Sequence, residues 1–287
     1  MPKYLKGTIL MNTRTIPFLF ILLLAMFACH KEPDLTLVEE TVLEGSVINA
    51  FTTDGDWEVE VISSDTSRVE LIYSKCFEKG ISAKLVGNKL LLALSYSEPF
   101  PSGATMKARV YTKEISSISL DYYSTAVFKG DFSSSELYMV IANHSSCSSI
   151  NTTMTGDCKI MIDKSSMLSD CQITCTKAII GATNSSRMTG VVAPSDSLIV
   201  ELNNNSRFVN YQAEPQAVKA RIGAASLMNI TQTTTQNLDI EIVASEASVN
   251  VVGHITGSLS DVSTLYYKGS PDMSGLDVSS DSEIVQL

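Results

Sequence analysis

The charged residues that acid–base catalysis would need are gathered in one stretch of the sequence. Paired carboxylates, or a basic side chain beside a cation site, are the groups with which enzymes cleave polysaccharides. The candidates are Asp157, Lys159, Asp163, Lys164, Asp170 and Lys177. Asp157, Lys159 and Asp163 alternate with apolar residues, which is also the pattern of any strand that has one face in solvent. We therefore expect no catalytic residues here, and a carbohydrate-active lyase or hydrolase is kept as the alternative.

Other residue types with catalytic or metal-binding chemistry are scattered along the chain. The histidines are His30, His144 and His254, too widely spaced to indicate a ligand set or a triad. The sequence contains neither Gly-x-Ser-x-Gly nor His-Glu-x-x-His, and it lacks the Asp and Gly spacing of calcium-binding nonapeptides. We expect no metal, no cofactor and no enzymatic activity.

Aromatic residues offer a second kind of site, because exposed rings at regular spacing can stack on sugars. The candidates are Tyr122, Tyr123, Phe128, Tyr138, Phe208, Tyr211, Tyr266 and Tyr267. The alternative is that Phe128 and Phe208 belong to the core and that the tyrosine pairs cover the ends of the fold. This second interpretation is the one we favour, and a glycan or a protein at the cell surface is kept only as a candidate ligand.

The six cysteines fall into two groups, Cys29 near the amino terminus and five others in the rest of the chain. The other five are Cys76, Cys147, Cys158, Cys171 and Cys175. An odd number cannot all pair within one chain, and the spacing matches no zinc motif. We expect most of the five to be small buried side chains, and one disulfide is left open.

The amino terminus has the three-part form of a secretory signal. Basic residues precede an apolar run from Ile16 to Ala28, which is too short to span a bilayer. Ala28 followed by Cys29 resembles a bacterial lipobox, in which the cysteine is acylated and becomes the new amino terminus. Cys29 is therefore the expected lipidation site and membrane anchor, with secretion or an uncleaved anchor as alternatives. Met11 is a second candidate for the start.

The charge balance excludes one class of partner. The formal net charge is −10, and Lys3, Lys6 and Arg14 are the only charged residues among the first 28, so the remainder carries −13. Such a charge repels phosphate backbones and anionic lipids. We expect no nucleic-acid partner, and we expect contact with a membrane only through the anchor.

A small polar step recurs along the second half of the chain and predicts a repeat. Its markers are Ser124, Ser145, Ser165, Ser185, Ser206, Ala225, Ser245, Ser263 and Ser280, at intervals of 17 to 21 residues. Short apolar runs lie upstream of most markers, so each repeat carries a strand. A period of this length is typical of a solenoid, in which each coil completes its core against its neighbours. The strands at Ile160, Ile179, Val200 and Ile240 are predicted to share one internal column, with Glu201 pointing outward.

The amino-terminal half shows period-two alternation, which indicates half-buried strands. Val47 to Phe51 and Trp57 to Val61 are two such segments, and Asp54-Gly55-Asp56 between them predicts a tight hairpin. The predicted fold class is therefore all-β, a single-chain parallel β-helix (β-solenoid) with about 20 residues per coil that follows an amino-terminal β-strand region. The expected domains are a signal peptide at 1–28, an acylated tether at 29–40, an amino-terminal β region at 41–115 and solenoid repeats at 116–287.

The end of the chain carries a family resemblance. Leu265 to Pro271 contains a Tyr-x-Gly-x-Pro turn, and Leu276 to Ile284 adds a small-residue step before a final strand. Both resemble the carboxy-terminal signature of the putative auto-transporter adhesin family with the head GIN domain, and Gly45 to Leu94 looks like the start of that family. The resemblance covers Leu43 to Leu287. It implies a β-helical fold on a secreted or surface protein of Bacteroidetes type, and it brings no catalytic residues.

These observations lead to one functional expectation. We expect a non-catalytic surface or periplasmic lipoprotein that serves as an adhesin-like recognition module or a structural module. Its expected location is the bacterial cell envelope, lipid-anchored in the outer membrane on the surface or the periplasmic face. The alternatives are a carbohydrate-active β-helix enzyme and a periplasmic scaffold or sensor.

Overall fold

The structure is a computed structural model that describes residues 32–287. Leu35–Leu287 form one compact unit. The expected signal peptide and Cys29 lie outside the described residues. Within residues 32–287 there is no α-helix, and one 3-10 turn, η1 (Lys75–Phe77), interrupts a chain of strands.

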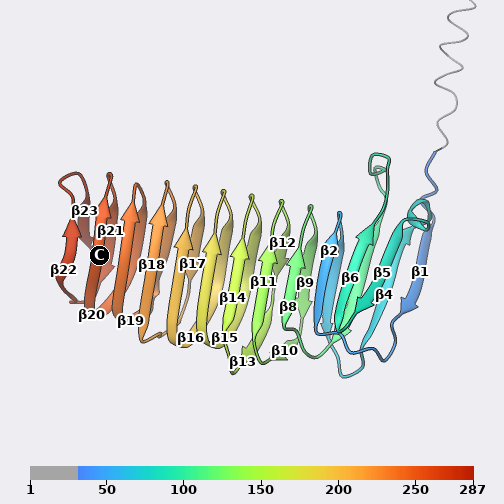
Figure 1. Ribbon diagram of the computed structural model, residues 1–287, viewed down its shortest axis with the longest axis horizontal. Coiled ribbons are helices and arrows are strands. Elements are labelled where there is room, and N and C mark those ends of the chain that lie inside the picture. Colours follow the sequence, from blue (N-terminus) through green and yellow to red (C-terminus); the bar gives the residue numbers. More distant parts are fainter. Residues whose placement is uncertain (1–31) are drawn as a thin grey trace, which may run out of the picture. The chain divides into compact units, whose positions relative to one another are not determined.

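All the strands belong to one hydrogen-bonded sheet (Figure 1). The first group is β1 (Leu37–Val42), β2 (Ala50–Asp54), β3 (Glu58–Ser63), β4 (Arg68–Ser74), β5 (Ile81–Val86), β6 (Lys89–Leu94) and β7 (Met106–Thr112). The second group is β8 (Ser117–Leu120), β9 (Thr125–Lys129), β10 (Asp131–Ser134), β11 (Leu137–Ile141), β12 (Ser146–Ser148), β13 (Asn151–Met154), β14 (Cys158–Ile162), β15 (Met167–Ala182), β16 (Arg187–Leu202), β17 (Arg207–Asn210), β18 (Ala217–Gly223), β19 (Leu227–Val243), β20 (Glu246–Ser260), β21 (Thr264–Lys268), β22 (Asp272–Val278) and β23 (Glu283–Gln286).

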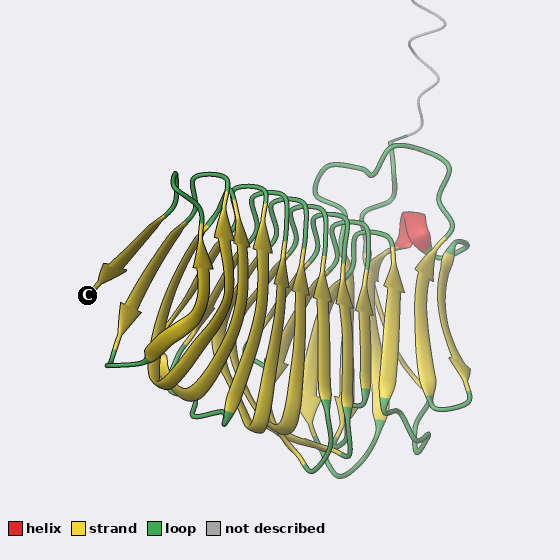
Figure 2. Cartoon of the chain, turned by 60° about the vertical axis from the view of Figure 1, so that its left-hand side comes forward, coloured by secondary structure: helices red, strands yellow, loops and turns green. Residues whose placement is uncertain are grey.

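The sheet winds into a β-solenoid of about eight turns, which confirms the predicted fold class. Face 1 consists of β2, β6, β8, β11, β14, β18, β22 and the carboxy-terminal parts of the long strands β15, β16, β19 and β20. Face 2 consists of β3, β7, β9, β12, β17, β21, β23 and the amino-terminal parts of the same long strands. The middle parts of these strands continue the stack of β10 and β13. Figure 2 shows the long strands curving from one face to the next.

The pairing register confirms about 20 residues per coil. Ile160, Ile180, Val200, Ala220 and Ile240 are successive partners on face 1, and all are buried. Because successive strand residues point to opposite sides, every second residue of each coil enters the core.

The predicted column contained one error, Ile179. This residue pairs with Lys159 and Ile199 on the outer side, and Ile180 takes the inner place. A register shift between Cys175 and Lys177 moves the alternation by one residue. Such a bulge reverses which of two adjacent isoleucines faces inward.

The order of the first coils in space differs from their order in sequence. β2 pairs with β6 on one side and β8 on the other, while β3 pairs with β7 and β9, all in parallel. The coil β2–β3 therefore lies between the coils β6–β7 and β8–β9 (Figure 1). The predicted hairpin at Asp54-Gly55-Asp56 is wrong, because this turn joins face 1 to face 2 within one coil.

The turns from face 1 to face 2 repeat from coil to coil and form a row along one edge of the solenoid (Figure 2). In most coils two consecutive residues have positive φ, for example Asn184 (54°) and Ser185 (65°). The second residue donates its N–H to the carbonyl of the first residue in the next coil, as in Ser185 N to Asn204 O at 2.8 Å. The same bond repeats in each turn from Tyr123 to Ala225 and satisfies these backbone donors along the edge.

A column of buried serines follows these turns. Its members are Ser124, Ser145, Ser166, Ser186, Ser206, Ser226, Ser245 and Ser263. The backbone N–H of Ser206 donates to Ser226 Oγ at 3.1 Å, and that of Ser226 donates to Ser245 Oγ at 3.2 Å. The predicted bonding of serines up and down the stack is confirmed for these pairs, whereas the buried Oγ atoms of Ser145 and Ser186 have no hydrogen-bond partner within residues 32–287. The markers Ser165, Ser185 and Ala225 lie one residue earlier, in the turns themselves.

Four of the five cysteines in the described residues behave as core residues. Cys147, Cys158, Cys171 and Cys175 are buried free thiols in neighbouring coils. Burial raises the pKa of Cys171 to about 12 and that of Cys175 to about 11. These thiols are therefore packing groups at neutral pH, and Cys76 in η1 is only half-buried.

Candidate functional site

Asp157 and Asp163 do not form a paired-carboxylate site. Asp157 precedes β14 and Asp163 follows it, so the five residues of β14 separate them, and the six steps along the chain span about 20 Å at the rise of a β-strand. Glycosidase carboxylates lie about 5–9.5 Å apart. Lys159, between them, has its Nζ 5.9 Å from the centroid of the Tyr138 ring.

Asp163 is a structural residue of the turn. Its Oδ1 accepts hydrogen bonds from Thr183 Oγ1 and Asn184 Nδ2, both at 2.7 Å. Desolvation raises the pKa of Asp163, but the hydrogen bonds from Thr183 and Asn184 outweigh it and leave that pKa below its ordinary value. The carboxylate therefore stays ionised and links one coil to the next.

The histidines lie apart as well. His144 occupies the turn after β11, and His254 lies on β20 with its Nδ1 3.5 Å from Asp272 Oδ2. His30 lies outside the described residues. Within residues 32–287, no group of three or more His, Cys, Asp or Glu side chains is placed to hold a metal ion.

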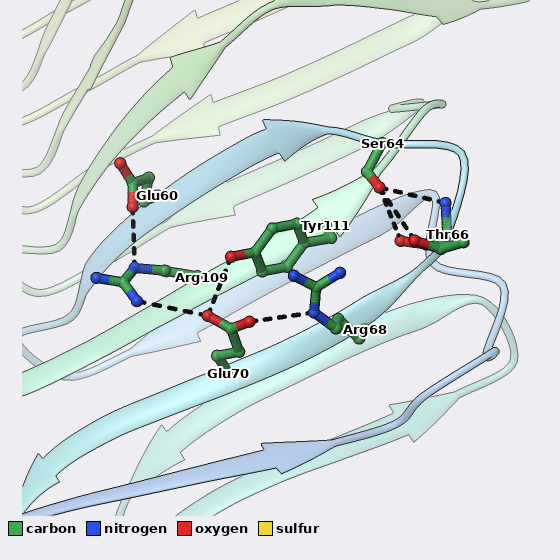
Figure 3. Close-up of polar contacts among 7 residues, drawn as sticks. All are labelled: Glu60, Ser64, Thr66, Arg68, Glu70, Arg109 and Tyr111. Atoms are coloured by element: carbon green, nitrogen blue, oxygen red, sulfur yellow. Dashed lines mark hydrogen bonds and ion pairs between the residues drawn. The ribbon is translucent and has the colours of Figure 1, made fainter.

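A charged cluster on β3, β4 and β7 was not singled out from the sequence. It consists of Glu60, Arg68, Glu70, Arg109 and Tyr111. Figure 3 shows Arg68, Arg109 and Tyr111 converging on Glu70, with Glu60 bound to the other side of Arg109. Arg68 Nε lies 3.1 Å from Glu70 Oε1, and Tyr111 Oη donates to Glu70 Oε2 at 3.0 Å. Arg109 bridges the two glutamates: its Nη1 lies 3.4 Å from Glu70 Oε2, and its Nε lies 3.2 Å from Glu60 Oε2.

The cluster of charges on Glu70 is fully paired. Desolvation raises the pKa of Glu70, but hydrogen bonds from Tyr111, Arg68 and Arg109 outweigh it and hold that pKa below its ordinary value. The guanidinium of Arg68 also lies over the Tyr111 ring, 3.6 Å from its centroid. An ionised carboxylate with all these donors is poorly suited to proton transfer, so the cluster ties the antiparallel β4 to the parallel coils.

The surface beside the cluster forms an open groove of about 420 Å³. Its charged lining residues are Glu58, Glu60, Lys107, Arg109 and Lys129. Lys107 pairs with Glu58 and Lys129 pairs with Glu60 across neighbouring strands. The alternating charges of β3 and β7 are visible in the sequence, but their meeting depends on the coil order, which the sequence does not show.

Exposed aromatic rings gather at the turn after β8. Tyr122 and Tyr123 are 54% and 59% exposed, and the Tyr123 ring stacks on His144 of the next coil, with centroids 5.1 Å apart and planes inclined by 11°. Coils lie on both sides of this turn, so the expectation that this tyrosine pair covers an end of the fold is wrong. Phe128 and Phe208 are core residues, as that alternative proposed.

The comparisons with known proteins bear on this fold and its surface. The family model described as "putative auto-transporter adhesin, head GIN domain" matches residues 49–271. The chain belongs to this family. The resemblance inferred from the two ends of the sequence is thereby confirmed, and none of the curated proteins matches the chain.

Solved structures of similar fold share little sequence with this family member. A putative adhesin from Parabacteroides distasonis has a TM-score of 0.65 at 12% identity, over 89% of this chain and 98% of that one. A putative adhesin from Parabacteroides merdae has a TM-score of 0.63 at 11% identity, over 88% and 96%. A putative lipid binding protein from P. distasonis has a TM-score of 0.55 at 12% identity, over 88% and 97%.

These likenesses concern the fold. The family and two of these neighbours are described as adhesins, a class of protein found at the cell envelope or cell surface. Residues 32–287 contain no helix that is long and apolar enough to cross a membrane.

Proposed function

We propose that the chain is a non-catalytic lipoprotein of the bacterial cell envelope, held in the outer membrane by acyl chains on Cys29 and used for adhesin-like recognition. The observation that carries the proposal is that the charged side chains serve structural contacts between coils and strands. Asp163 and Glu70 accept hydrogen bonds that hold coils and strands together, and they do not face each other across a cleft. The solenoid is therefore a rigid support for surface side chains.

The family supports the recognition role, and the sequence supports the anchor. A single acyl chain binds membranes only marginally, so stable anchoring needs the several chains that a lipoprotein cysteine carries. With net charge −13 beyond residue 28, the folded part gains nothing from anionic lipid. The anchor is thus the proposed route to the membrane, and the ligand is a glycan or a protein at the cell surface.

The test of the anchor compares two cysteine variants of the full chain in cells. Cys29→Ser should move the protein from the membrane fraction to the soluble fraction, whereas the matched control Cys76→Ser should sediment with membranes as the wild type does. Retention of Cys29→Ser in membranes after a high-salt wash would overturn the anchor.

The test of recognition measures attachment of the same cells to a mucin-coated surface, which offers both glycan and protein ligands. Cells that display the wild type should attach more than cells without the gene, and Cys29→Ser should remove the difference. Equal attachment by all three strains would refute the recognition role.

A further inference from the structure

Tyr122, Tyr123 and His144 form an exposed surface that we call the aromatic corner. Both tyrosines are more than half exposed, and the parallel stack of Tyr123 on His144 extends the ring surface across two coils. Tyr123 N donates to Asn143 O at 3.0 Å, which fixes the two turns against each other. The rings are therefore carried by a rigid part of the edge.

Tyr122 and Tyr123 have a backbone conformation that tyrosine rarely adopts. Their φ angles are 50° and 63°, in the left-handed region, where Asn is several-fold enriched and bulky residues are uncommon. The same two places hold Asn204 and Asn205 in one coil and Ala224 and Ala225 in the next. The turn is therefore built equally well with small or polar residues, and the fold itself does not require two exposed aromatic residues here.

Carboxylates flank the aromatic corner on the side of the coil β2–β3. Ser124 Oγ donates to Gly55 O at 2.6 Å and Asp121 N donates to Thr53 Oγ1 at 3.2 Å, so the turn Asp54–Asp56 lies against the turn that carries the tyrosines. The side chains of Asp54 and Asp56 are exposed and have no ion-pair partner within residues 32–287. Their oxygens can accept hydrogen bonds from hydroxyl groups.

We propose that the aromatic corner binds a neutral oligosaccharide, a step that rests on the proposed recognition function. Sugar rings would stack their C–H faces on the tyrosines and donate hydroxyl hydrogen bonds to Asp54 and Asp56. The nearby carboxylates disfavour an anionic polysaccharide. A protein ligand fits less well, because protein interfaces need about 800 Å² per partner with an apolar centre, and the residues beside the rings, such as Asp121 and Asn143, are polar.

The test uses the purified full chain in detergent micelles and three neutral probes: cellohexaose, mannohexaose and chitohexaose. Titration calorimetry should detect binding of at least one probe, and saturation-transfer NMR should show transfer from tyrosine to sugar C–H protons. The double variant Tyr122→Ala with Tyr123→Ala should weaken that binding at least tenfold. Alanine fits both places because Ala224 and Ala225 occupy them in another coil.

The matched control removes two exposed tyrosines elsewhere, Tyr138→Ala with Tyr211→Ala, which are 45% and 38% exposed. It should bind the probe as the wild type does, and circular dichroism should show equal folding of both double variants. Equal affinity of the corner variant and the wild type, or no binding of any of the three probes to the wild type, overturns the inference.

Cell attachment separates this inference from the proposed function. If wild-type cells attach to mucin and periodate oxidation of its glycans abolishes attachment, the glycan inference is supported. If attachment survives periodate and the corner variant attaches normally, a protein ligand is indicated and the glycan inference fails, while the recognition function stands.

Discussion

Buried serines fix the conformation of the turns by hydrogen-bonding to their backbone groups. Ser206 Oγ donates to Asn203 O at 2.8 Å, while its backbone N–H reaches Ser226 Oγ in the next coil. A small side chain with both a donor and an acceptor is suited to this place, because the turn brings polar backbone groups into a dry interior. This explains why a serine step recurs in the sequence while the apolar residues around it vary.

Removal of one hydroxyl from this column should be costly. Ser226→Ala leaves the buried N–H of Ser206 without its side-chain acceptor, and an unsatisfied buried donor costs about 1–3 kcal/mol. Thermal unfolding followed by circular dichroism should show a lowered midpoint. The exposed Ser195→Ala should unfold like the wild type, and a Ser226→Ala midpoint equal to it would contradict the role of the column.

The internal column gives a second test at the residue scale. Val200 is fully buried between Ile180 and Ala220, whereas Glu201 is exposed. Val200→Asp buries a charge without a partner, at a cost of several kcal/mol. The control Glu201→Asp introduces the same aspartate side chain at the next residue, which is exposed, and should therefore change the unfolding midpoint little. Similar midpoints for the two purified variants would show that the register is wrong.

At the scale of strands, the sequence predicted where strands occur better than it predicted how they pair with one another. Periodicity located the strands and the coil length, because apolar alternation and the serine step are local signals. It misplaced Ile179 because Ile179 and Ile180 are both apolar and the bulge after Cys175 leaves no local mark. It also predicted a hairpin at Asp54-Gly55-Asp56, because a local turn signal cannot show that β2 and β3 each pair with coils formed later in the chain.

The same limit applies to the sites. The aromatic residues were visible as candidates, but only the turn geometry separates the exposed Tyr122 and Tyr123 from the buried Phe128. The cluster on Glu70 was missed because Arg68 and Arg109 lie on strands that are far apart in sequence and antiparallel in space. Charge alternation within one strand does not reveal which strand lies beside it.

The Glu70 cluster should make stability depend on pH. Because the folded-state pKa of Glu70 lies below its ordinary value of 4.5, its contribution is full above that value and is lost as the pH falls through the lowered pKa. Glu70→Gln should cost about 1 kcal/mol at pH 7, since the partners are partly exposed.

The measurement for this cluster is the unfolding midpoint of wild type and Glu70→Gln between pH 7 and pH 3. The difference should shrink below about pH 4.5, where the wild-type carboxylate also becomes neutral. The control Glu214→Gln removes an exposed acid and should show no such change. A difference that stays constant with pH would mean that the charge of Glu70 is not what stabilises β4.

At the scale of the whole solenoid, the two ends are built differently. β1, β4 and β5 run antiparallel to their neighbours and close the amino-terminal end. At the other end, β22 pairs with β20 and β23 pairs with β21, and neither pairs with any further described strand. Leu276 and Ile284 remain partly exposed there. An open parallel edge is a template for association unless charge opposes it.

Asp277 and Glu283 supply that charge on the last two strands. Asp277→Asn with Glu283→Gln should therefore promote end-to-end association, because like charges no longer meet when two open edges approach. Light scattering coupled to size exclusion should detect larger species than in the wild type at the same protein concentration. The control Glu201→Gln with Glu214→Gln removes the same number of charges from mid-stack surfaces and should elute as the wild type does. If both double variants associate equally, the net charge of the protein, and not the charge at the edge, prevents association. If neither variant associates, the geometry of the last coil alone protects the open edge.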